Sequence, residues 1–284
     1  AYGMSQLSLT GTTITMTDGT VSSYTGFRGD ALAGVTLRME NVTTTSAAHG
    51  IHLKTVSAAS SFTITDCATD VTNAGVSGNA LFLETFADSA LKVVGSTFTN
   101  VGHSAISLET LSNTDVSFKT TTATATAVGA SGLISAGFAG GSLSFASSSF
   151  TGEKFGVTLD TLTAPVTARA LTATSTGDPG LSGDGGFDVN IATSAIALTD
   201  CAFAGRNALH LNGLTSSSVH VRRGSAAGQI NGLLYAGVID AGSTLTIDGG
   251  TISALAGDAV LFPAVLGTVN LINGFTLDSP VTFF

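Results

Sequence analysis

Residues 79–111 read NALFLETFADSALKVVGSTFTNVGHSAISLETL, and this stretch decides the fold. It holds two apolar-x-apolar motifs in a fixed order. The motif at 81–83 is followed by an apolar residue three positions later and recurs at 106–108, while a second motif lies between them at 91–93. Apolar residues that alternate with period two predict short β-strands with one apolar face.

Both motifs recur along the whole chain and keep phase with each other. The motif at 91–93 has its first copy ending at Met16 and its last at Leu271, so 255 residues cover ten intervals of about 25 residues each. That period is typical of solenoid proteins. A third apolar position follows this motif by five residues and holds Phe98, Phe150, Phe203 and Ile252.

A turn position follows each copy of the same motif after two residues. Most of its residues tolerate the tight or left-handed backbone that a sharp corner between two strands needs. The series is Asp18, Asn41, Asp66, Gly95, Thr120, Ser147, Ala170, Asp200, Arg223, Gly249 and Asn273.

Together these features predict an all-β protein, a parallel β-helix (β-solenoid) of about eleven turns with about 25 residues per turn. Residues 1–284 are expected to form a single β-helix domain. A β-sandwich or barrel is the alternative, because it also has many short strands at regular spacing. Neither explains why the same motifs recur in the same order.

On these motifs the chain resembles the right-handed parallel β-helices of the pectin-lyase-like superfold, from about Leu7 to Phe283. Within that group it is most similar to bacterial adhesin or autotransporter passenger domains. The group also contains polysaccharide lyases, hydrolases and phage tailspikes, so the resemblance implies a fold rather than an activity. It also implies an extracellular or cell-surface, secreted protein.

Composition excludes several classes of function. The net charge of −9 argues against nucleic-acid binding. The chain has no run of about 20 apolar residues, so we expect no transmembrane segment. Cys67 and Cys201 occupy the same point of the repeat five turns apart, too far for a disulfide. No pattern of residues indicates a cofactor.

Side chains that could carry chemistry are few. Glu84 and Glu109 come from adjacent turns about 5 Å apart, which could suit a retaining glycosidase or form a solvated face. Asp178, Asp184 and Asp188 lie in or next to the longest connection and are candidate calcium ligands.

Histidines are expected on the surface, since three of them alternate with inward apolar residues. These are His52, His210 and His220. Asp188 and His210 fall one turn apart at equivalent outward positions, so the sequence allows a contact between them.

Apolar residues at outward positions of the motif at 81–83 predict an interface. These are Phe82, Ile134, Leu234 and Leu261, and the apolar C-terminal residues Phe283 and Phe284 are added to them. Neither end of the chain shows a convincing cap, which predicts head-to-tail stacking into filaments unless the chain is cut from a longer solenoid.

We therefore expect a non-enzymatic extracellular structural or adhesive protein. Its expected partner is a second copy of itself, bound end to end or side by side. Glycans are the other candidate partner. The alternative is a carbohydrate-binding or carbohydrate-cleaving β-helix, a lyase or a hydrolase. Glu84 and Glu109 would then be the acids that act on the sugar.

Overall fold

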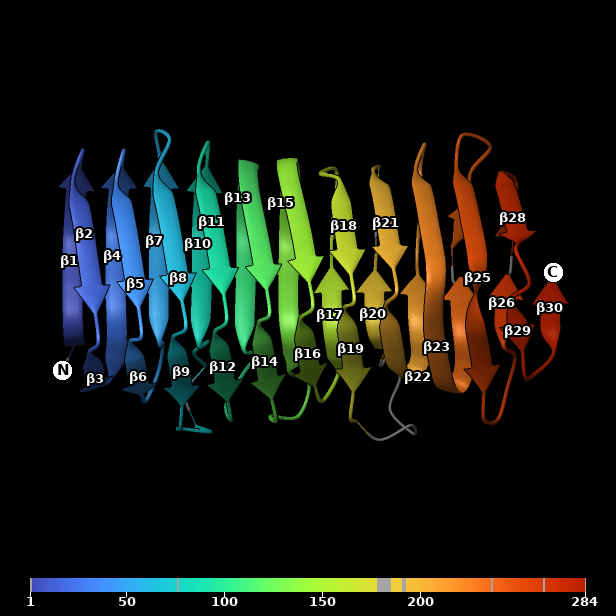
Figure 1. Ribbon diagram of the computed structural model, residues 1–284, viewed down its shortest axis with the longest axis horizontal. Helices are drawn as coiled ribbons and strands as arrows, with labels where there is room; N and C mark the ends of the chain where they lie inside the picture. The colour runs from blue at the N-terminus through green and yellow to red at the C-terminus, as the bar shows by residue number, and fades with distance from the viewer. Residues whose placement is uncertain are drawn as a thin grey trace.

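The computed structural model describes residues 2–75, 77–177, 185–190, 193–235, 237–262 and 264–283, without the side chains of 2–7, Tyr235 and Phe283. Within them the chain winds into a parallel β-solenoid of about ten coils with about 25 residues each, and these residues contain no helix. The N- and C-termini lie at opposite ends of a rod (Figure 1). The predicted fold class is confirmed.

Each coil contributes strands to three faces, because the chain turns between them at sharp corners. Face A contains the motif first seen at 91–93. Its strands are β2 (Thr13–Thr17), β5 (Thr36–Glu40), β8 (Ser61–Thr65), β11 (Ala90–Val94), the second halves of β13 (Ile106–Lys119) and β15 (Ser131–Ala146), β18 (Val166–Arg169), β21 (Ala195–Thr199), the starts of β23 (Ser218–Tyr235) and β25 (Thr244–Ala254), and β28 (Thr268–Ile272).

Face B follows face A in each coil and carries the third apolar position. Its strands are β3 (Thr20–Ser23), β6 (Thr43–Ser46), β9 (Ala68–Val71), β12 (Thr97–Asn100), β14 (Thr122–Ala125), β16 (Ser149–Gly152), β19 (Thr172–Ser175), the start of β22 (Ala202–Leu211), the middle of β23, the end of β25, and β29 (Thr276–Leu277).

Face C contains the motif first seen at 81–83. Its strands are β1 (Tyr2–Thr10), β4 (Thr25–Ala33), β7 (Ile51–Ser57), β10 (Leu81–Ala87), the first halves of β13 and β15, β17 (Phe155–Leu159), β20 (Gly185–Val189), the ends of β22 and β23, β26 (Val260–Phe262) and β30 (Val281–Phe283). A separate two-stranded pair joins β24 (Val238–Ile239) to β27 (Ala264–Val265).

The corner between faces A and B confirms the predicted turn series at every position. All of its residues have a positive φ, from 49° at Ser147 to 68° at Gly249. One left-handed residue bends the chain sharply within a single step, so the next strand can begin on face B. Ala170 and Arg223 also adopt this backbone, with φ of 53° and 50°.

The core is one continuous column of apolar side chains inside the coils. On face B, large and small residues alternate from coil to coil in the order Phe98, Ala123, Phe150, Ala173, Phe203, Ala226 and Ile252. All of these are buried. Alternation of this kind lets facing side chains interdigitate without voids.

Phenylalanines from faces A and B meet inside this column. The ring of Phe150 lies edge-on to the rings of Phe118 and Phe145, with centroids 5.7 and 5.4 Å away. Such edge-to-face pairs add to the energy of apolar burial. The two thiols, Cys67 and Cys201, are buried, and both are free, as their distance along the repeat predicted.

Candidate functional site

Outward side chains of face C form one straight column, because every coil pairs with the next in the same register. The column runs through Arg28, His52, Phe82, Ser107, Ile134, Thr158, Asp188, His210, Leu234, Leu261 and Thr282. The four apolar residues of the predicted interface belong to it and are half-buried.

Polar residues interrupt the apolar ones along this column. Only Leu234 and Leu261 are direct neighbours among the predicted interface residues, since polar side chains flank both Phe82 and Ile134. The backbone of Phe283 pairs with that of Phe262. The side chain of Phe283 and the whole of Phe284 lie outside the described residues.

Three aromatic rings stack at the N-terminal part of the column. The ring of Phe82 lies 4.7 Å from that of His52 and 5.2 Å from that of His49, centroid to centroid. The backbone N–H of Asn79 donates to Nδ1 of His49 at 3.2 Å, a contact that needs an unprotonated nitrogen. The expectation that His52 faces solvent is wrong: it is buried, because the neighbouring rings cover it. His220 is 48% exposed, as expected.

Glu84 and Glu109 lie beside this ring stack on adjacent strands, as predicted. The register that joins Leu83 to Leu108 makes them neighbours on β10 and β13. An oxygen of Glu84 lies 3.3 Å from Nε2 of His52. Burial, followed by the negative charge of Glu84, raises the pKa of Glu109 above its ordinary value. Two neighbouring carboxyl groups, one of them with a raised pKa, are the arrangement that acid catalysis on sugars uses.

The histidine cluster predicts a loss of stability in acid. Burial, followed by the nearby His52, lowers the pKa of His49 from 6.5 to about 4, and Arg28 and His103 add to the effect. The unfolded chain then takes up a proton that the folded chain refuses, so stability falls as the pH drops from 6.5 towards 4. After allowance for the partial exposure of His49, we expect a loss of about 2 kcal/mol.

Urea unfolding at pH 7 and at pH 4.5 measures this loss, and His49→Gln should remove most of it. His220→Gln is the matched control, because His220 is 48% exposed. An equal pH dependence in wild type and in His49→Gln would contradict the assignment to His49.

A second feature of face C is a cleft of about 350 Å³ around Asp188 and His210. Nδ1 of His210 contacts one carboxylate oxygen of Asp188, and the hydroxyl of Thr158 donates to the other at 3.0 Å. Asp188 is almost fully buried, at 1% exposure. The contact that the sequence allowed is confirmed, but His210 is mostly covered rather than on the surface, with 13% of its side chain exposed.

Both polar and apolar groups line this cleft. Ile134 and Phe155 provide apolar surface, while Lys154, Asp160 and Asn190 provide charge and hydrogen-bonding groups. A concave site that combines apolar walls with a few fixed polar groups is typical of ligand binding. The sequence indicated the Asp188–His210 contact in this cleft. It did not indicate that Lys154 and Phe155 line the cleft, since these two residues precede the repeating motif.

Asp188 is expected to stabilise the fold as well as the cleft. Asp188→Ala leaves Nδ1 of His210 and the hydroxyl of Thr158 without their buried acceptor. We expect the free energy of unfolding to fall by about 2 kcal/mol. Asp70→Ala, at an exposed acid on face B, should change it by less than about 0.5 kcal/mol. Urea unfolding of the two variants makes the comparison, and equal effects would refute a buried role for Asp188.

Only one of the three predicted calcium ligands, Asp188, lies among the described residues. Asp178 and Asp184 lie outside the described residues, and Asp188 engages His210 and Thr158. Among the residues that the structure describes, no group of three or more His, Cys, Asp or Glu side chains is arranged to hold a metal ion.

Comparison with protein-family models, with curated proteins and with solved structures gave no match. In the described part of the chain, no helix is long and apolar enough to cross a membrane.

Proposed function

We propose that this chain is a non-enzymatic structural or adhesive β-helix that acts outside the cell as a rigid rod. The observation that carries the proposal is the unbroken register of face C, which holds the outward side chains of successive coils in one column. Stacked repeats are suited to binding because they present extended surfaces on a rigid frame. The cleft at Asp188 and His210 gives that surface a recessed place for a ligand.

The first partner that we propose is a second copy of this chain, bound through the apolar residues of face C. Leu234 and Leu261 are neighbours in the column and half-buried in the single chain. Pairing two rods along this face would remove apolar surface from water, which is the main favourable term in association. End-to-end stacking is the second route.

Negative-stain microscopy and sedimentation of the purified chain test the proposal together. We expect fibres or side-by-side assemblies, and we expect Leu234→Ser with Leu261→Ser to weaken lateral assembly. The matched control is Leu255→Ser, at a residue that is 86% exposed and outside the column. Fibres that persist unchanged in the double variant would favour end-to-end stacking. Monodisperse monomers that depolymerise a glycan would overturn the structural proposal.

The second candidate is a carbohydrate-binding or carbohydrate-cleaving protein, which the ring stack of His49, His52 and Phe82 favours. Flat rings beside two carboxyl groups resemble the mixture of apolar surface and fixed polar groups found in ligand sites. Two acids on adjacent strands could serve a retaining mechanism. A screen of polysaccharides for release of reducing ends tests this function.

If activity is found, Glu84→Gln and Glu109→Gln are each expected to reduce it by about a hundredfold or more. Glu40→Gln is the control, because Glu40 lies on face A and pairs with Arg38 at 2.8 Å. Unchanged turnover in the first two variants would exclude this pair from the chemistry.

A further inference from the structure

Positive charge gathers on face A, although the chain as a whole carries −9. In the five-residue stretches of face A the first, third and fifth residues point outward, and in the four-residue β18 the second and fourth residues do. Those outward columns hold five of the ten Lys and Arg residues but only three of the nineteen acids, counted over the described strands. The cations are Arg38, Lys92, Lys119, Arg169 and Arg222, and the acids are Glu40, Asp115 and Asp248.

A cleft of about 480 Å³ opens on face A where three arginines converge. Arg169 pairs in register with Thr199, and Thr199 pairs with Arg222 on the next strand. The backbones of the two arginines are therefore two strand spacings apart, about 10 Å. Ala197 and Thr199 lie between them, and these small side chains leave the space open.

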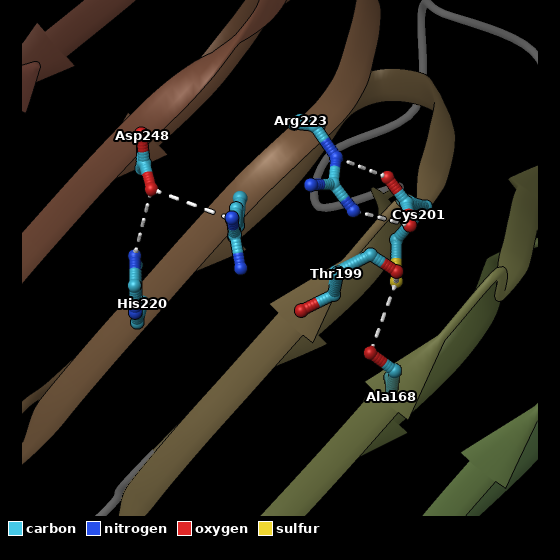
Figure 2. Close-up of polar contacts among 8 residues, drawn as sticks. Ala168, Thr199, Cys201, His220, Arg223 and Asp248 are labelled. Carbon is cyan, nitrogen blue, oxygen red and sulfur yellow. Dashed lines mark hydrogen bonds and ion pairs between the residues drawn. The ribbon is translucent and has the colours of Figure 1, made fainter. Parts of the chain in front are cut away.

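Of the three arginines, only Arg223 forms a close ion pair with a described residue. Arg223 donates Nε and one Nη to the two carboxylate oxygens of Asp200 at 2.8 and 2.9 Å (Figure 2). Nε of Arg222 lies 3.6 Å from Asp248, beyond hydrogen-bond distance. Arg169 has no ion pair with any described residue within 4.0 Å.

All three arginines act electrostatically on the carboxylate of Asp200. The hydrogen bonds from Arg223 lower the pKa of Asp200, and the charges of Arg169 and Arg222 lower it further. An anion placed in the cleft would be attracted by the charges of Arg169 and Arg222 in the same way, without the hydrogen bonds that Arg223 gives to Asp200. Each guanidinium presents a planar fork of N–H donors that matches the oxygens of phosphate or sulfate.

We propose that the cleft between Arg169 and Arg222 binds a tetrahedral oxyanion, the phosphate or sulfate group of a larger molecule or of a free ion. The oxygens of a tetrahedral group point in several directions and can meet a guanidinium fork on each side, whereas the two oxygens of a carboxylate lie in one plane and face one fork squarely. Thr199 lies between the two arginines in the strand register, and its hydroxyl can donate a further hydrogen bond. This inference is independent of the adhesive role proposed above.

Calorimetric titration with inorganic phosphate and with sulfate at low salt tests the site. We expect measurable binding that weakens as salt rises, since exposed charges are screened. Arg169→Gln with Arg222→Gln should weaken binding about tenfold or more. Arg38→Gln should weaken it less than about twofold, because Arg38 lies on the same face but far along the rod. Since all three side chains are exposed, the variants should fold as the wild type does, which circular dichroism checks.

Further ligands identify the source of the anion. Glucose 6-phosphate that binds as tightly as inorganic phosphate would indicate a monoester on a larger molecule, and weaker binding would indicate the free ion. Equal binding of phosphate by the wild type and by the double variant would overturn the proposal. So would acetate that competes as well as phosphate, or an equal loss in Arg38→Gln.

Discussion

Phe150→Ala is expected to lower the free energy of unfolding by about 4 kcal/mol. Phe150 is fully buried, and its ring packs edge-on against Phe118 and Phe145. Its partners in the coils before and after are Ala123 and Ala173. These small side chains cannot grow into the space left by the ring, so the cavity stays open and the cost falls within the range of about 3–5 kcal/mol for such changes.

Urea unfolding followed by far-ultraviolet circular dichroism measures this loss. Val128→Ala is the control, because Val128 is 86% exposed and should change stability by less than about 0.5 kcal/mol. A loss below about 1 kcal/mol for Phe150→Ala would mean that the column repacks, contrary to the packing described here.

Gly141→Ala is the second substitution with a large expected effect. Gly141 lies in β15 at a φ of 71°, and an added Cβ would come closer than 3.0 Å to the backbone of Thr114 in the preceding coil. Backbone strain and this clash act together, and Thr114 is buried and cannot move aside. We expect a loss of about 3 kcal/mol.

Gly129→Ala separates the two causes. Gly129 has a φ of 77°, but an added Cβ there would meet nothing within 4 Å. It should therefore cost only the strain of a left-handed backbone, about 1 kcal/mol. Thermal or urea unfolding of both variants gives the comparison. Equal losses would show that strain alone, without a clash between coils, governs Gly141.

The sequence predicted the fold well because its signal is repeated in every coil. A motif at one position is weak evidence for a strand, but the same motif at a constant interval indicates a stack. The corner residues were predictable for the same reason: Ala170 and Arg223 are not typical of left-handed backbone, yet their place in the series assigned them correctly.

The candidate sites were less predictable, because each depends on what neighbouring side chains do. His52 and His210 alternate with inward residues, which indicates the outward side, but the sequence does not tell whether neighbours cover them. The arginine cleft was missed although its signal was present. Arg169 and Arg222 stand at the same point of the repeat, two coils apart, with Thr199 at that point in the coil between them. Their proximity becomes visible only when the residues at this point are compared from coil to coil.

The amino-acid sequence alone determined the parallel coils, the corners between faces and the inward column, because each is set by the local alternation of apolar residues and by the conformational freedom of single residues. The tertiary structure decided the rest: the shielding of His52 and of His210, and the spacing of Arg169 from Arg222. These depend on distances between side chains from different coils, and those distances exist only once the coils stack in register.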